Sequence, residues 1–168
     1  AAGSLGGWVA DEQALSHEGD CWIYDENSIV YAGATVAGNA RLTQICEVSH
    51  QAAIGGNARV CASRISHGAR LSENVIVKGA RVHGHCHLFG SAYIGEQCQI
   101  VGAKGLTADS DLPLQIYDRA RLTDCRVVHQ AQIYGDASLC HAFIEHRAEI
   151  YDRARLEGNE ANNIWVCD

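Results

Sequence analysis

Four histidines occupy equivalent positions in a repeating pattern, and histidine is the side chain best suited to moving protons near neutral pH. They stand in the strings VSHQA, ISHGA, VVHQA and IEHRA, which contain His50, His67, His129 and His146. Histidine makes up only nine of the 168 residues, so four of them in one register is an enrichment. A neutral imidazole can accept a proton from a hydroxyl or an amine, so the pattern indicates a candidate general base. Duplication of coils could also repeat a corner histidine without any chemistry, and this structural interpretation stays open.

These histidines belong to one series of positions, here called the histidine column, which would lie at one corner of a coiled chain. The column reads Ala32, His50, His67, Gly84, Gly102, His129 and His146. Imidazoles stacked about 5 Å apart resist simultaneous protonation, because each positive charge disfavours the next. We therefore expect these histidines to stay neutral.

The element that must position the column is a six-residue repeat. Val, Ile or Leu fills 21 positions, most of them six residues apart, from Val30 to Ile100 and from Ile116 to Leu156. Two residues before these aliphatic positions, 19 of the 21 residues are Ala, Cys or Ser. A period of six fits neither an α-helix nor an ordinary strand. It predicts a parallel β-helix of triangular section with about eight coils, in which the aliphatic side chains fill the interior.

The irregularities of the repeat support this phasing. With Val30 on the first side, steps of five residues occur only between the third and first sides, at 60–65, 77–82, 122–127 and 139–144. The one long interruption, 102–113, falls at the corner between the first and second sides. It contains the only proline and several polar residues, so we predict an excursion loop there. We expect residues 1–20 to cap the solenoid and residues 21–168 to form it.

Composition narrows the class of protein. The net charge of −7 argues against nucleic-acid or anionic-membrane partners, and no apolar run is long enough to cross a bilayer. Four of the eight cysteines fill the small interior slot, which favours core thiols in a reducing cytoplasm over a disulfide framework. The chain has no methionine and ends inside the patterned segment NNIWVCD, so we expect it to be a piece of a longer protein.

The repeat resembles the hexapeptide-repeat acyltransferase superfamily. The strings GGWV, LSHEGDCWIYDEN, LQIYDRARL, RVVHQAQIYG, HAFIEHRAEIYD and NNIWVCD are similar to the bacterial YdcK-type proteins, which are described as acetyltransferases mainly from their fold. The resemblance covers essentially the whole chain. It implies an all-β fold, a single-stranded left-handed parallel β-helix.

The resemblance also implies a function. Acetyl-CoA or another acyl-CoA would donate the acyl group to the hydroxyl or amine of a small-molecule acceptor, and a corner histidine would act as general base. His129 and His146 match the phase of that histidine, and His129 is the first of the column after the predicted loop. The superfamily commonly forms trimers with sites between neighbouring prisms, so a homotrimer is expected. The chain has no C-terminal helix of the kind that often completes such a site, and no distinct CoA motif.

Two other interpretations stay open beside acyl transfer. Under the acyltransferase interpretation no metal ion is expected. His141 and His146 are five residues apart across a corner, which resembles the last two zinc ligands of γ-class carbonic anhydrases; the slot of their third histidine here holds Asp124. Asp124, His141 and His146 are thus the alternative metal ligands. The non-enzymatic alternative is a β-helical scaffold or assembly module whose histidine column has no chemical role.

Overall fold

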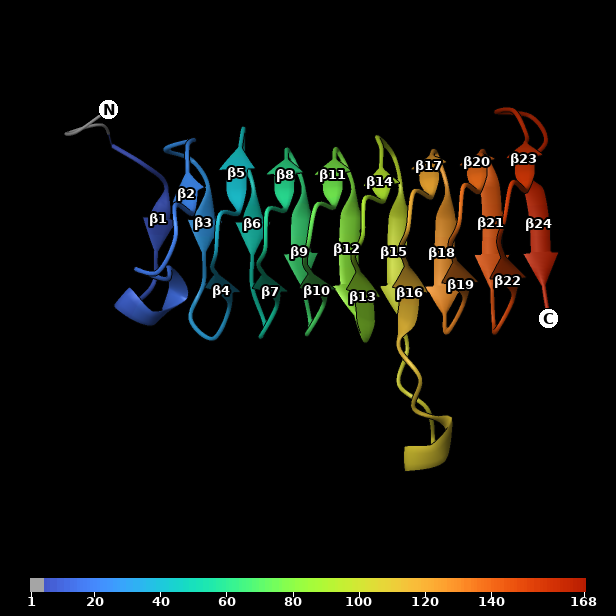
Figure 1. Ribbon diagram of the computed structural model, residues 1–168, viewed down its shortest axis with the longest axis horizontal. Helices are drawn as coiled ribbons and strands as arrows, with labels where there is room; N and C mark the ends of the chain where they lie inside the picture. Colours follow the sequence, from blue (N-terminus) through green and yellow to red (C-terminus); the bar gives the residue numbers. More distant parts are fainter. Residues whose placement is uncertain (1–4) are drawn as a thin grey trace.

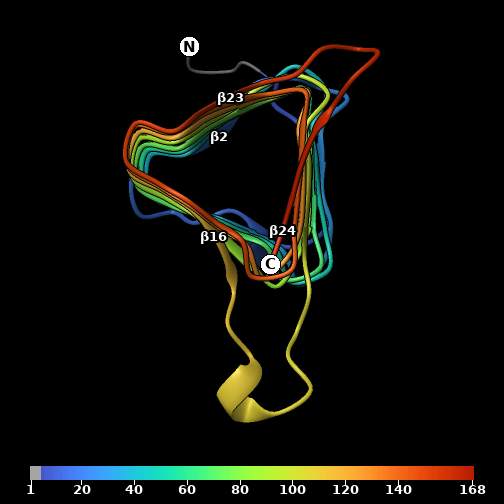
Figure 2. The same cartoon turned by 90° about the vertical axis from the view of Figure 1, so that its right-hand side faces the viewer.

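The computed structural model describes residues 5–168, which form one elongated solenoid of triangular section (Figures 1 and 2). Figure 2 looks along the long axis from the C-terminal end. The chain runs down the side that contains β24, along the side that contains β16, and back along the side of β2 and β23. It turns clockwise while advancing toward the viewer, so the solenoid is left-handed. The predicted parallel β-helix is confirmed, with about nine coils on its longest side instead of about eight.

Each side of the prism is one parallel sheet. The first contains β1 (Trp8–Val9), β3 (Ile29–Val30), β6 (Glu47–Val48), β9 (Arg64–Ser66), β12 (Arg81–Gly84), β15 (Gln99–Gly102), β18 (Arg126–His129), β21 (Ala142–Glu145) and β24 (Ile164–Cys167). The second contains β4 (Thr35–Val36), β7 (Ala53–Ile54), β10 (Arg70–Leu71), β13 (Cys86–Leu88), β16 (Leu114–Ile116), β19 (Gln132–Ile133) and β22 (Glu149–Ile150). The third contains β2 (Trp22–Ile23), β5 (Arg41–Thr43), β8 (Arg59–Cys61), β11 (Ile76–Lys78), β14 (Tyr93–Ile94), β17 (Arg121–Thr123), β20 (Ser138–Cys140) and β23 (Arg155–Glu157).

The interior is built from the two repeating positions. Every aliphatic residue of the series is buried except Leu156, which is half-buried in the last complete coil. The small residues beside them are buried as well, apart from Ala154. Aliphatic residues of successive coils lie directly in register, as Val82, Ile100 and Val127 do on β12, β15 and β18. The outward residues between them must therefore also stack in columns.

Cysteine acts as a core residue in this interior. All eight cysteines are free thiols, and five of them are buried. Burial raises the pKa of the Cys86 thiol to about 12, so that thiol stays protonated and unreactive at neutral pH.

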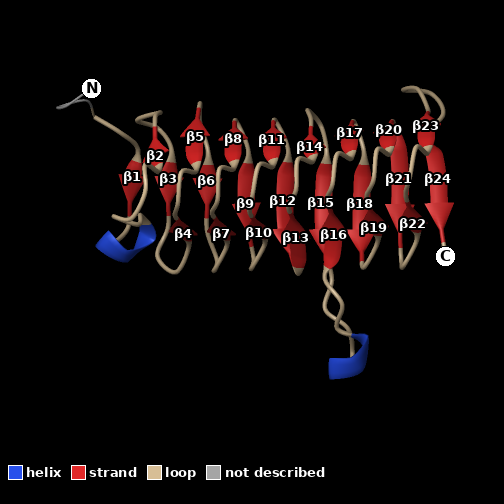
Figure 3. Cartoon of the chain, in the orientation of Figure 1, coloured by secondary structure: helices blue, strands red, loops and turns tan. Residues whose placement is uncertain are grey.

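Only two short 3-10 helices interrupt the strands of residues 5–168 (Figure 3). The first, η1 (Glu12–Ala14), lies at the N-terminal end, where Asp11 caps it through the backbone N–H groups of Gln13 and Ala14. The second, η2 (Ala108–Ser110), lies at the tip of the segment between β15 and β16, which projects from the corner between the first and second sheets. No helix among the described residues is long and apolar enough to span a membrane.

The projecting segment leaves the solenoid after Gly102, which pairs with Gly84 of the preceding coil. His67, Gly84 and His129 all turn the corner with φ between +56° and +86°, whereas Gly102 lacks this left-handed conformation. A Cβ at Gly84 would lie 2.0 Å from the carbonyl oxygen of Gly102, and one at Gly102 would lie 2.2 Å from that of His85. Only glycine fits either position, because backbone oxygen fills the space of a side chain.

This packing predicts unequal effects for two similar substitutions. Gly84 and Gly68 both have φ near +80°, but nothing lies within 4 Å of a Cβ placed at Gly68. We expect Gly84→Ala to lower the free energy of unfolding by about 1–3 kcal/mol more than Gly68→Ala, because overpacking adds to the shared backbone strain. Urea denaturation followed by circular dichroism measures the difference. Equal losses in the two variants would contradict the clash.

Candidate functional site

The histidine column forms two pairs separated by the two glycines. His50 and His67 stack with ring centroids 4.4 Å apart and an interplanar angle of 6°. His129 and His146 lie 4.9 Å apart with rings inclined by 51°. Between the pairs, Gly84 and Gly102 stand opposite each other, and Gly102 stands opposite His129. Segment 103–113, here called the excursion loop, projects from this gap between β15 and β16 (Figure 1). The pair His50 and His67 follows β6 and β9 on one side of it, and the pair His129 and His146 stands at the ends of β18 and β21 on the other.

The pair His129 and His146 opens into a cavity of about 600 Å³. Its other walls come from the excursion loop, through residues that include Lys104 and Leu106, and from Arg147 beside His146. This volume is within the usual range for small-molecule pockets. Leu106 is fully exposed and gives the cavity an apolar rim.

Two glutamines that follow β18 fix the far leg of the loop. Gln130 is 9% exposed; its side-chain amide donates to the carbonyl of Ser110, and its oxygen accepts from Arg147 Nε at 3.2 Å. Gln132 Nε2 donates to the carbonyl of Pro113 at 3.0 Å. The loop wall of the cavity is thus held by hydrogen bonds from the same coil that contains His129.

The hydrogen bond of His129 determines which of its nitrogens carries the proton. His129 Nδ1 accepts a hydrogen bond from the backbone N–H of His146 at 3.2 Å. A neutral ring with an acceptor at Nδ1 holds its proton on Nε2. In this arrangement His129 can donate a hydrogen bond into the cavity but has no free lone pair with which to act as a base.

His146 has the opposite arrangement. Its Nδ1 lies 3.8 Å from Glu145 Oε2, and a carboxylate at Nδ1 favours the tautomer with the proton on that nitrogen. Glu145 Oε1 accepts a hydrogen bond of 2.8 Å from Trp165 Nε1, which fixes the carboxylate in place. Nε2 of His146 is then the atom with a free lone pair. Indole, carboxylate and imidazole thus follow one another, with a hydrogen bond between the first two and a longer electrostatic contact of 3.8 Å between the last two.

Glu145 and Trp165 are functional candidates that the sequence reasoning missed. Glu145 was detectable, because it directly precedes His146 in the string IEHRA. Trp165 had no such signal, since it lies 20 residues from Glu145 and reaches it only through the pairing of β21 with β24.

The structure separates the alternative metal ligands. Asp124 Oδ2 lies 4.0 Å from His141 Nε2, whereas His141 and His146 lie at opposite ends of β21. Within one chain, therefore, Asp124 and His141 come together and His146 does not join them.

A different group, His129, Glu145 and His146, brings three possible ligand atoms within 4.8 Å of one another. This set fits a metal poorly. The Nδ1 lone pair of His129 is already used, and ligation through Nε2 would place an N–H against the backbone N–H of His146.

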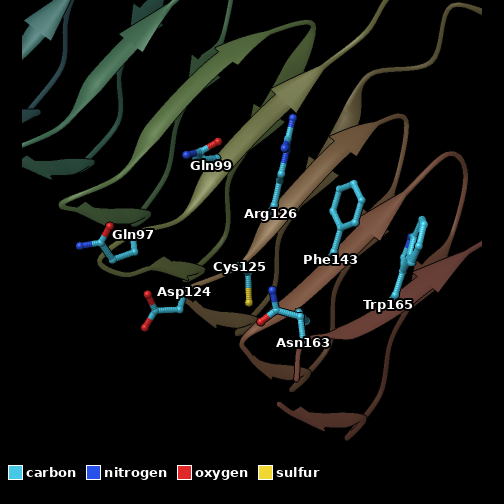
Figure 4. A pocket seen from close by; sticks show the side chains of 9 residues that line it. Gln97, Gln99, Asp124, Cys125, Arg126, Phe143, Asn163 and Trp165 are labelled. Carbon is cyan, nitrogen blue, oxygen red and sulfur yellow. The ribbon is translucent and has the colours of Figure 1, made fainter. Parts of the chain in front are cut away.

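A further cavity of about 450 Å³ lies on the outer face of the first sheet (Figure 4). Arg126, Phe143 and Trp165 follow one another across neighbouring strands, with the Arg126 guanidinium 5.5 Å from the Phe143 ring centre. Asp124 lines this cavity, but no histidine of the column does. Its rings support the position of Trp165, because Phe143 and Trp165 stack at 5.7 Å.

A substitution at Gln130 tests whether its hydrogen bonds hold the excursion loop against the cavity. Gln130→Leu keeps the size of the side chain but removes both hydrogen bonds, so we expect about 1–2 kcal/mol lower stability and faster proteolytic cleavage within 103–113. Gln51→Leu is the matched control, because Gln51 also follows a column histidine but is exposed. Similar cleavage rates in the two variants, by mass spectrometry of the fragments, would show that Gln130 does not hold the loop.

Comparisons with known proteins agree with this architecture. The family model described as the YdcK β-solenoid repeat matches residues 52–68. The chain is also 50% identical over 167 residues to a protein of Escherichia coli (strain K12) named "Uncharacterized acetyltransferase YdcK". That alignment covers 99% of this chain and 51% of the relative, so the chain spans about half the length of the curated relative it matches. The predicted resemblance is thereby confirmed: the chain is a hexapeptide-type β-solenoid similar to the YdcK proteins along nearly its whole length.

Proposed function

We propose that the cavity beside the excursion loop transfers an acetyl group from acetyl-CoA, or a related acyl group from its acyl-CoA, to the hydroxyl or amine of a small-molecule acceptor. The observation that carries the proposal is the arrangement of Trp165, Glu145 and His146. It leaves His146 Nε2 as an oriented base at the edge of the cavity. The name of the Escherichia coli relative supports the same reaction class.

His146 and His129 have different roles in the proposed reaction. His146 Nε2 takes the proton from the acceptor as its oxygen or nitrogen attacks the thioester carbonyl. The C–S bond then breaks, and the departing thiolate of CoA recovers that proton from the imidazolium. His129 does not remove the proton in this scheme; its Nε2–H donates a hydrogen bond that positions a carbonyl or hydroxyl of the substrate.

The cavity also has two cationic side chains and one carboxylate, that of Asp168, in its lining. Lys104 of the excursion loop and Arg147 both line it. Arg147 is held by Gln130, so its guanidinium is fixed before substrate arrives. Preorganised donors of this kind stabilise the tetrahedral oxyanion, and they are worth most where water is excluded.

Exclusion of water is a reason to propose an assembly. The cavity is open on the side of Leu106, whose side chain is fully exposed. We propose that full-length chains associate as a trimer, in which a neighbouring prism closes this side. The superfamily resemblance supports this arrangement, and the mass of the full-length protein in solution tests it.

Replacing the two cavity histidines separates their roles. We expect His146→Gln to lower kcat for acetyl transfer by about 10²–10⁴-fold, the usual contribution of a general base. His129→Gln should cost about tenfold or less, because the glutamine amide still donates a hydrogen bond. Thiol release from acetyl-CoA with a panel of amine and hydroxyl acceptors provides the assay for the full-length protein. The reverse order of effects would assign the base to His129.

The matched control is His50→Gln, which replaces a column histidine outside this cavity and should leave the rate unchanged. If the full-length protein neither binds acetyl-CoA by calorimetry nor consumes it with any acceptor, the acyltransfer proposal fails. The non-enzymatic scaffold is then the better interpretation.

The positioning role of Glu145 makes a separate prediction. Glu145→Gln removes the charge that orients His146, so we expect kcat to fall about tenfold while KM for acetyl-CoA stays constant. Trp165→Phe keeps the aromatic ring against Phe143 but loses the N–H donor, and it should produce the same pattern more weakly. A rise in KM without a change in kcat would indicate a binding or purely structural role for this pair.

A further inference from the structure

The histidine pair on the other side of the excursion loop has a cavity of its own. This cavity, of about 790 Å³, is lined by His50 and His67 and by Arg70, His85 and His87 of the body. Asp111 and Pro113 form its loop wall, and Lys104 borders both cavities. The proposed reaction uses none of the histidines here. We call this space the N-terminal cavity.

The N-terminal cavity carries excess positive charge in a protein whose net charge is −7. None of the ion pairs found among residues 5–168 includes Arg70 or Lys104. Asp111 is its only acidic residue. Asp111 Oδ1 already accepts from the backbone N–H of Gly105 at 2.9 Å and lies 3.5 Å from His85 Nε2. Two cations therefore face the cavity without a carboxylate partner.

The Nδ1 atoms of His50 and His67 each face a serine hydroxyl, unlike Nδ1 of His129. His50 Nδ1 lies 2.9 Å from the Ser49 hydroxyl, and His67 Nδ1 lies 2.9 Å from the Ser66 hydroxyl. A hydroxyl oxygen can accept from Nδ1–H, so either ring can hold protons on both nitrogens without losing its partner. At His129 the same nitrogen faces a backbone N–H, which disfavours a second proton. His129 thus differs from His50 and His67 in the group that faces its Nδ1.

What opposes protonation in this pair is repulsion between two rings stacked at 4.4 Å. Among the surrounding charges, Glu47 pairs with Arg64 at 3.1 Å, and Glu73 Oε2 accepts from the backbone N–H of Gly90 at 3.0 Å. Arg64 offsets the charge of Glu47, whereas Glu73 keeps a negative charge that also acts on His87. A bound anion would add counter-charge at the stacked pair itself.

Two further imidazoles border the stack but stay neutral. Burial, with the charge of His67, lowers the pKa of His83, whose ring lies 5.8 Å from that of His67. Burial, with the charge of Arg70, lowers the pKa of His87, although Glu73 opposes this shift. His87 also contacts Ser72 Oγ at 2.9 Å.

We propose that the N-terminal cavity binds a small dianion of the sulfate or phosphate type, separately from the acyl-CoA site. Arg70 holds the anion at neutral pH, Lys104 adds positive charge from the shared boundary, and His50 and His67 strengthen the binding as they become protonated. The excursion loop separates the two cavities, with Pro113 on one and Leu106 on the other, so an anion here does not occupy the space beside His146.

Sulfate is the suitable probe, because it stays a dianion throughout the range in which histidine titrates. We expect calorimetry on the full-length protein to give one saturable sulfate site whose Kd falls about tenfold from about pH 8 to about pH 6. The paired replacement His50→Gln with His67→Gln should remove most of this pH dependence. Arg70→Gln should abolish binding, while Arg70→Lys retains it.

His129→Gln is the control, because its ring lies in the other cavity, and sulfate binding should be unchanged. Three outcomes would overturn the proposal: no saturable binding, equal binding by wild-type and Arg70→Gln proteins, or loss of binding in His129→Gln. Displacement of sulfate by CoA would also overturn it, because the cavity would then hold phosphates of the acyl donor. These measurements need no acyl transfer, so their failure is distinct from failure of the proposed activity.

Discussion

Register between successive coils is the constraint on which every other feature depends. Each strand is only two to four residues long and cannot bury its aliphatic side chain without the coil above and below. Parallel pairing places Val82, Ile100 and Val127 over one another inside the prism. The same pairing places equivalent outward residues over one another at about 4.8 Å. A column of histidines at one corner is therefore a geometrical consequence of repeated sequence, and its chemistry must come from what differs between the coils.

Those differences are small and local. His50 and His67 each follow a serine, and their rings lie nearly parallel beside the serine hydroxyls. His129 follows a valine, so its Nδ1 takes the backbone N–H of the next coil instead. His146 follows Glu145 and gains a carboxylate. One residue before each histidine thus decides whether the ring can be doubly protonated, is held as a donor, or is oriented as a base.

The excursion loop divides the histidine column into two pairs, and each pair lines a cavity of its own. Its exit requires glycine at positions 84 and 102, because backbone oxygens occupy the space of side chains there. The absence of side chains at these positions divides the histidines, and the loop then forms a wall for each pair. Gln130 and Gln132 hold that wall through backbone carbonyls of the loop. The loop thus forms the boundary between the two cavities, and Lys104 lines both of them.

The amino-acid sequence was sufficient for the solenoid, its interior residues, the position of the loop and the existence of the histidine column. These follow from a strict period and from residue size, both of which are local properties. It could not rank His129 against His146, because the ranking depends on a hydrogen bond between coils and on a tryptophan from the following strand. It also left Asp124, His141 and His146 as one alternative group, and only the folded chain shows that His141 lies beside Asp124 and His146 beside Glu145. The tautomer of each histidine, and the set of side chains that meet at a site, depend on contacts between coils. Only the folded chain determines those contacts.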